Sequence, residues 1–311
     1  MFKTTESTSC YLRIFSIGSM LVMLLSSLTP AQDNTLLSEA EIKTIKQRIV
    51  SVINQQRRAH GLRHVQIDEF ASKIADQHCQ EMLQAGYISH WNQAGYKPYI
   101  RYSFAGGTEA VMENVASQWS SIRFDIARIQ QAVEQLHMGM YNEQPPNDGH
   151  RRNILQPQHT HVGIGVSVST SGIRFAEEFI ARYIEIKPVP RHAKPGEKIE
   201  VKGSMLFDKT DLAYIEVFYE PLPKKFSVDE LLKLVTPYSF PDDHYVMRPI
   251  LPDGYQYTDG LVGTIRYNAE EGDFSCPINF PTNRTGIYTI VAWVKYGKEK
   301  FPATNISIEV R

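Results

Sequence analysis

Hydrophobic positions between residues 36 and 143 recur at intervals of three and four, the spacing that places side chains on one face of a helix. Ser38 followed by Glu41 is a capping box, which predicts a first helix that begins there and ends near Gly61. Asp68 can cap a second helix that stops at Gly86, and two prolines at 145 and 146 close a third run. The predicted apolar faces comprise Ile42, Ile45, Ile49, Val52 and Ile53, then Phe70, Ala71, Ile74, Ala75, His78 and Met82, then Ile126, Ile129, Val133, Leu136 and Met140.

The pattern changes to that of strands after residue 160. Residues 161–168 are rich in β-branched side chains, Ser171-Gly172 is a turn signal, and a second strand is predicted over residues 173–186. Residues 36–186 are therefore predicted to form an α+β domain, with helices packed on an antiparallel sheet.

A different organisation is predicted for the rest of the chain. Residues 187–190, Lys-Pro-Val-Pro, are typical of a stiff linker. Beyond them, hydrophobic residues alternate with polar ones, and a single short helix is expected over residues 228–234. The alternating pairs and triplets are Ile199/Val201, Ile215/Val217/Tyr219, Ile287/Thr289/Val291 and Ile306/Ile308/Val310. We predict an all-β sandwich of immunoglobulin-like type over residues 191–311, a kind of domain that binds partners or spaces domains.

The N-terminus has the pattern of a secretory signal peptide over residues 1–31. Lys3 and Arg13 precede an apolar run at residues 14–25, which is shorter than the roughly 20 residues that a membrane span needs. Small residues near Ala31 suit cleavage by a signal peptidase. We expect a secreted or periplasmic protein with a cleaved signal, and a retained N-terminal anchor is the alternative.

Charge and cysteine content narrow the class of protein. The chain has 33 basic and 34 acidic residues, a formal net charge of −1, which does not favour general electrostatic capture of nucleic acid. Three cysteines are too few for a disulfide framework. Beyond the signal peptide only Cys79 and Cys276 remain, and we expect each to be a small buried hydrophobe in a different domain.

Ionisable residues concentrate in four segments of the first domain, at residues 89–91, 113–116, 140–143 and 149–155. Two histidines and two glutamates in one cleft would suit zinc. The spacing differs from the compact His-Glu-x-x-His motif, so the residues alone leave alternatives open. His90 and His150 could instead only hold loops by hydrogen bonds, and Glu113 could cap a helix that it opens.

The other histidines have simpler expected roles. His78 and His137 are expected to be satisfied residues of the core or its boundary. Surface positions are expected for His60, His64, His159, His161, His192 and His244.

The order of the segments resembles the CAP superfamily, also called SCP/TAPS, which includes cysteine-rich secretory proteins, antigen 5 and pathogenesis-related 1 proteins. The resemblance covers residues from about 45 to 186, and the scarcity of cysteine resembles bacterial members. The segments are Asn54-x-x-Arg57-x-x-x-Gly61, Ala71-x-x-x-Ala75, Gly86-Tyr87-Ile88-Ser89-His90, Arg101, Glu113-Asn114-Val115-Ala116, Gly149-His150-Arg151-Arg152-Asn153-Ile154-Leu155 and Val162-Gly163-Ile164-Gly165-Val166.

This resemblance implies an α-β-α sandwich whose cleft holds a His/Glu/Glu/His tetrad that binds zinc or another divalent ion. His90, Glu113 and His150 match the family motif, with the two histidines as the expected metal ligands. Glu143 is the expected second acid. Glu134 is the alternative, because Met140 stands where the family usually has tryptophan.

The family resemblance favours a non-catalytic binding module over an enzyme, with a lipid, an envelope glycan or another component of the cell envelope as partner. The chain has no Gly-x-Ser-x-Gly nucleophile motif. One alternative is a metal-dependent extracellular hydrolase that uses His90, His150 and Glu113. Another is a structural cell-surface protein with a vestigial cleft.

Overall fold

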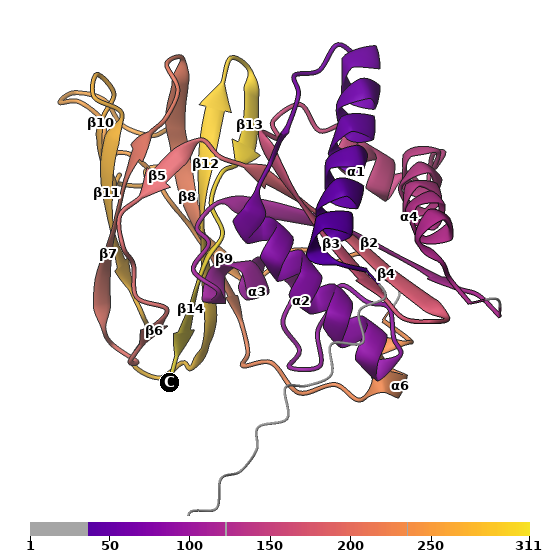
Figure 1. The fold of residues 1–311 in the computed structure, drawn as a ribbon. Helices are drawn as coiled ribbons and strands as arrows, with labels where there is room; N and C mark the ends of the chain where they lie inside the picture. The colour runs from indigo at the N-terminus through magenta and orange to yellow at the C-terminus, as the bar shows by residue number, and fades with distance from the viewer. Residues whose placement is uncertain (1–36, 122, 235) are drawn as a thin grey trace, which may run out of the picture. The chain divides into compact units, whose positions relative to one another are not determined.

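The computed structural model describes residues 37–311 except residues 122 and 235 (Figure 1). The predicted signal peptide, residues 1–31, lies outside the described residues. Among the helices of the described part, none combines the length and the apolar character that crossing a bilayer requires.

Three predicted helices are present, as α1 (Glu39–Ala59), α2 (Glu69–Ala85) and α4 (Ile126–Tyr141). Ser38 and Glu41 form both bonds of the capping box, and Gly86 ends α2 in the left-handed conformation at φ 80°. Two further helices, α3 (Pro98–Phe104) and α5 (Gly149–Ile154), were not predicted. The placement of Phe70 on the buried face of α2 was wrong, since its side chain is 39% exposed.

A four-stranded sheet forms the middle layer of this part of the chain. Its strand order is β1 (Gln66–Ile67), β3 (His161–Val168), β4 (Gly172–Ala181) and β2 (Ala110–Trp119), and all pairs except β1 with β3 are antiparallel. Helices α1 and α4 pack on one face through a shared hydrophobic cluster, and α2 packs on the other. The α+β prediction with helices on a sheet is therefore confirmed for this part, as a three-layer arrangement.

The remaining strands form two further sheets. One contains, in spatial order, β10 (Arg266–Asn268), β11 (Asp273–Asn279), β7 (Lys198–Met205) and β5 (Ile184–Ile186). The other contains β6 (His192–Ala193), β14 (Ile306–Val310), β12 (Gly286–Tyr296), β8 (Thr210–Glu220) and β9 (His244–Met247), with β13 (Glu299–Pro302) also paired to β12. The short helix α6 (Val228–Leu231) lies in the connection from β8 to β9, within the predicted range. An immunoglobulin-like topology for these strands stays a prediction.

The two parts of the chain are in close contact. Strand β5 already pairs with β7, so the chain changes sheet before the proline-rich residues 187–190. Strand β2 is an edge strand, and its free edge is covered by the later part of the chain, because the N–H of Ala110 donates to the carbonyl of Ala303 and that of Val111 to Asn305 Oδ1. The division into two domains stays a prediction. Cys79 and Cys276 are both free and buried, one in each part.

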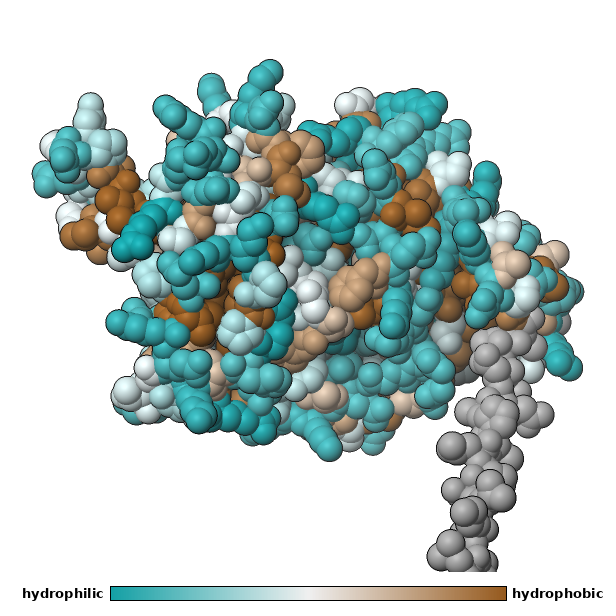
Figure 2. Space-filling model, turned by 60° about the vertical axis from the view of Figure 1, so that its left-hand side comes forward, coloured by the Kyte–Doolittle hydropathy of each residue, from teal (hydrophilic) through white to brown (hydrophobic). Residues whose placement is uncertain are grey.

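The face of the molecule drawn in Figure 2 is largely hydrophilic, and its hydrophobic areas are separated from one another by polar residues. Scattered exposed apolar residues of this kind are normal for a folded protein and do not by themselves indicate an interface.

Candidate functional site

Strand β2 places Glu113 at the centre of the candidate site. Because successive side chains of a strand point to opposite faces, Glu113 faces α2 and α3, whereas its neighbour Asn114 faces α4 and α5. The alternative that Glu113 caps a helix was wrong, since the residue lies inside a ten-residue strand.

Glu113 holds His90 in place. The Nδ1 atom of His90 lies 2.8 Å from Glu113 Oε1, and the Glu113 side chain is fully buried. Arg101 forms an ion pair with the same carboxylate and also donates to the backbone carbonyl of His90. A buried carboxylate that is paired with a guanidinium and bonded to an imidazole is a rigid support for that imidazole.

A second buried carboxyl group, Glu178, stands directly across from Glu113 on strand β4. Burial raises the pKa of both groups, and the Arg101 guanidinium opposes this rise at Glu113. Two adjacent carboxyls cannot both be ionised without a large cost, so Glu178 keeps its proton and Glu113 carries the charge. Sequence reasoning missed Glu178, although two successive glutamates within a predicted strand were a usable signal.

His150 forms the second histidine–carboxylate pair. Its Nδ1 atom lies 2.5 Å from Glu143 Oε1, and its backbone N–H donates to Glu143 Oε2 at 3.0 Å. The alternative acid, Glu134, instead accepts two hydrogen bonds from Arg48 on α1. The structure therefore brings Glu143 to His150 and leaves Glu134 on the outer surface of α4.

The two pairs lie near each other. Asn114, next to Glu113, donates to the carbonyl of His150 at 3.3 Å. Burial lowers the pKa of His90 to about 4, and the charges of Arg101 and His150 act in the same direction. His90 is therefore neutral at pH 7. Within the described residues, neither histidine has a hydrogen-bond partner at Nε2, and the side chains are 15% and 32% exposed.

A buried network of hydrogen bonds lies next to His150 in the protein interior. His137 is bonded through Nδ1 to Glu177 and through Nε2 to Gln56, at 2.5 and 2.9 Å. Asn114 donates to Glu177 and accepts from Asn153 of α5. His137 is thus a satisfied core histidine, as predicted, and the network fixes the position of α5 and of His150 with it.

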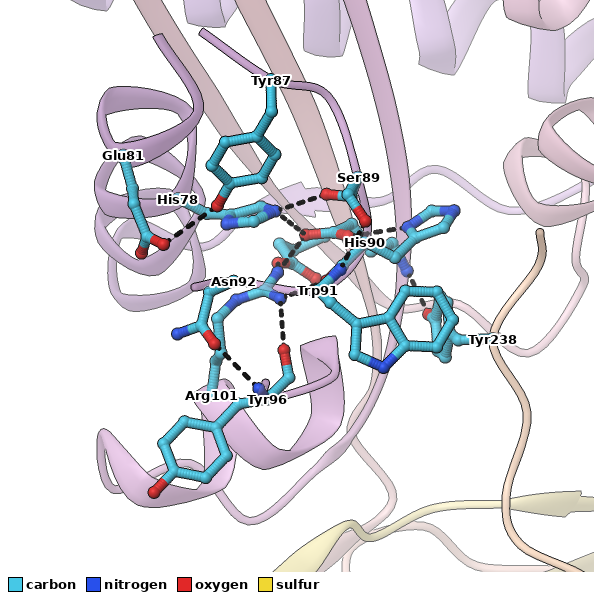
Figure 3. A network of polar contacts seen from close by, with 12 residues as sticks. His78, Glu81, Tyr87, Ser89, His90, Trp91, Asn92, Tyr96, Arg101 and Tyr238 are labelled. Carbon is cyan, nitrogen blue, oxygen red and sulfur yellow. Dashed lines mark hydrogen bonds and ion pairs between the residues drawn. The ribbon is translucent and has the colours of Figure 1, made fainter. Parts of the chain in front are cut away.

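The connection from β8 to β9 crosses the site, and we call residues 221–243 the strap; it is described apart from residue 235. The hydroxyl of Tyr238 accepts from the N–H of Glu113 at 2.8 Å, and its ring contacts the His90 ring at 4.8 Å (Figure 3). Leu231 of the strap is fully buried against the cluster that contains Cys79 and Met82. Sequence reasoning assigned the later part of the chain no role at this site and missed Tyr238.

The side chains present offer two imidazole nitrogens that could take part in binding a divalent ion. The Nε2 atoms of His90 and His150 are available donors, and the carboxylate at each Nδ1 fixes the tautomer that leaves Nε2 free to bind. No group of three or more His, Cys, Asp or Glu side chains that could hold an ion occurs within the described residues. Any further ligands would have to come from solvent or from a bound molecule.

Comparison with known proteins gives matches to about half of the chain. Residues 50–181 match the model of the CAP family, described as the cysteine-rich secretory protein family. The chain is 27% identical over 155 residues to the uncharacterized protein YkwD of Bacillus subtilis (strain 168), covering 50% of this chain and 54% of that protein. It thus spans about half the length of the curated relative that it matches.

Two solved structures are similar over a comparable part of the chain. One is an extracellular protein containing an SCP domain from Bacillus anthracis, with 22% identity, coverage of 47% of this chain and 44% of that chain, and a TM-score of 0.36. The other is an outer surface protein from Borrelia burgdorferi, with 19% identity, coverage of 46% of this chain and 94% of that chain, and a TM-score of 0.35.

The ordered segments, the three-layer fold and the family match agree on the same part of the chain: residues 50–181 form a CAP domain, similar to those of bacterial proteins.

Proposed function

We propose that the protein is a secreted or periplasmic binding module whose cleft binds zinc or another divalent ion through His90 and His150. One observation carries this proposal: each imidazole is held at Nδ1 by a carboxylate, so that its Nε2 is directed to ligand binding. A bound ion would supply positive charge and open coordination positions for a ligand. The later strands, proposed as an immunoglobulin-like sandwich, would then take part in ligand binding, in part through the strap that crosses the site.

The same geometry favours binding over hydrolysis. A hydrolase of the kind considered above needs a free carboxylate as general base beside a metal-bound water. Glu113 is fully buried, is paired with Arg101, and contacts His90 at Nδ1 rather than at Nε2. Glu143 is likewise committed to Nδ1 of His150. Both acids therefore orient imidazoles and are poorly placed to activate water on the far side of the rings.

A groove between α1 and α4 supports a lipid as one class of ligand. It has a volume of about 680 Å³, and its apolar lining includes Ile45, Ile49 and Met138. Arg48 and Glu134 lie at its polar rim. An apolar interior with a charged rim suits a molecule with a hydrocarbon chain and a polar head.

Zinc titration by calorimetry tests the metal site. Wild-type protein should bind zinc, and His90→Ala and His150→Ala should each abolish binding. Glu143→Gln should weaken binding by about 10-fold to 100-fold, because the imidazole loses its orienting carboxylate. Glu134→Gln is the matched control and should bind like wild type, since Glu134 pairs with Arg48. Absence of zinc binding by the wild type, or full binding by both histidine variants, would refute the proposal.

A further inference from the structure

A further hollow lies between α2 and α3, and Arg101 is one of the residues that line it. Its volume is about 230 Å³. The residues that line it are Ile74, Gln77, His78, Glu81, Asn92, Tyr96, Arg101, Phe104 and Ala105. Pockets for drug-sized ligands usually measure about 300–1,000 Å³, and each liquid water occupies about 30 Å³, so this hollow has room for one small ring or for several waters.

Two buried nitrogens among the lining residues have no hydrogen-bond partner within the described residues, His78 Nδ1 and Arg101 Nε. The side chain of His78 is 0% exposed and that of Arg101 is 8% exposed. Figure 3 shows both residues facing the side where Glu81 and Asn92 lie. An unpaired buried polar atom costs free energy, and such atoms are uncommon in folded proteins, which points to a missing partner.

The chemistry of that partner follows from the two atoms. His78 Nε2 lies 2.8 Å from the carbonyl of Ser89, which can only accept, so the proton of His78 is on Nε2 and Nδ1 is an acceptor. Burial lowers the pKa of His78 well below its usual range, which keeps the ring neutral. Arg101 Nε always carries a proton and can only donate. The two unpaired nitrogens therefore present one acceptor and one donor.

A hydroxyl group has the chemistry that both atoms require, because it can donate to His78 Nδ1 and accept from Arg101 Nε. An ionised carboxylate has no proton for His78, and an ammonium group has no lone pair for Arg101. Tyr96 and Phe104 add an apolar wall, with their rings packed edge to face at 5.3 Å. Glu81 and Asn92 add polar groups to the lining.

We propose that this hollow binds one neutral sugar ring of a glycan. The inference rests on the proposed binding role and names its ligand class. The hollow adjoins the metal site through Arg101 and through His78, whose Nε2 lies 4.0 Å from Glu113 Oε2. Several hydroxyls around an apolar ring face match a donor, an acceptor and an aromatic wall better than a fatty acyl chain does, since an acyl chain would leave both nitrogens unpaired.

Saturation-transfer NMR with glucose and N-acetylglucosamine tests the proposal on the full chain in the presence of a chelator, so that the metal site does not contribute. Both sugars should give a saturable signal, and acetate should give none. Gln77→Trp places a large side chain in the lining of the hollow and should weaken sugar binding by about tenfold or more. Gln80 is an exposed glutamine three residues after Gln77 on α2, and it does not line the hollow. Gln80→Trp is therefore the matched control and should bind the sugars as the wild type does.

Ala105→Phe fills the hollow from the α3 side and provides a second blocking variant, with thermal unfolding used to show that each variant is folded. If the wild type gives no sugar signal, the hollow holds water only and the inference is wrong, even where zinc binding in the separate titration succeeds. Equal sugar binding by Gln77→Trp, Ala105→Phe and Gln80→Trp would place the sugar elsewhere and would also overturn it.

Discussion

At the scale of single residues, Arg57 fixes the conformation of the loop that follows α5. Its guanidinium is fully buried and donates to the carbonyls of Arg63, Ile154, Gln156 and His159. These bonds draw the loop that follows α5 into the interior. The expected surface position of His159 was therefore wrong, since its side chain is 2% exposed and stacks on Phe179.

The burial of His159 predicts a stability that falls in acid. Burial and the charge of Arg57 lower the pKa of His159 to about 3, whereas an unfolded histidine titrates near 6.5. Between these values the unfolded state binds more protons, so the free energy of unfolding decreases as pH falls from about 6.5 toward 3, by up to about 1.4 kcal/mol per pH unit for such a group. Urea unfolding at a series of pH values measures this slope.

Two variants distinguish the contribution of His159 to the pH dependence of stability from that of other titrating groups. His159→Phe keeps an aromatic ring beside Phe179 and should flatten the pH dependence of the free energy of unfolding. His64→Phe, at an exposed position, should leave the slope as it is in the wild type. An unchanged slope in His159→Phe would show that His159 does not stay neutral in the folded protein.

At the scale of elements, glycines on β3 explain how closely α2 lies on the sheet. A Cβ added to Gly163 would meet the backbone of Ala71 at 2.4 Å, and one added to Gly165 would meet the backbone of Ala75 at 2.4 Å. The small residues of the helix and the glycines of the strand therefore face each other. This contact sets the distance from α2, which carries His78, to the strands that carry Glu113 and Glu178.

Gly165→Ala is consequently expected to destabilise the fold by about 1–3 kcal/mol, because the backbone of α2 has to move to admit a methyl group. Gly139→Ala in α4 is the matched control. An added Cβ there meets nothing within 4 Å, and removing a helical glycine should stabilise the protein by about 0.5–1 kcal/mol. Chemical denaturation of both variants measures the difference, and a neutral Gly165→Ala would contradict the proposed packing.

At the scale of the whole molecule, the later part of the chain contributes to the core and to the candidate site of the earlier part. A single hydrophobic cluster contains Ala110 and Tyr183 together with residues of the later strands such as Ile290. The strap contributes Tyr238 to the site, and Asn305 bonds the edge of β2 close to Glu113. A module that only spaces domains would not need these contacts.

We expect the chain to unfold in one cooperative transition, because the apolar contacts and edge hydrogen bonds join both parts. Differential scanning calorimetry measures the number of transitions. Asn305→Ala, which leaves the buried N–H of Val111 without its acceptor, should lower the temperature of the whole transition at a cost of about 1–3 kcal/mol. Two separate transitions, with only one of them shifted in this variant, would contradict the expectation.

The amino-acid sequence by itself determined the local elements, because their signals are local. The capping box at Ser38, the stop at Gly86 and the apolar periodicity predict α1, α2 and α4, and the ordered motifs identify the family and the two histidines. Strand β2 was not predicted, since the residues around Glu113 form a strand through pairing with β4 rather than through their own alternation.

The tertiary structure alone decided which groups meet at the site. Glu178 faces Glu113 because of strand register, Glu143 rather than Glu134 reaches His150 because of how α4 ends, and Tyr238 arrives from a segment 125 residues further along the chain. Such contacts depend on long-range packing of several elements at once, and no short stretch of sequence encodes them.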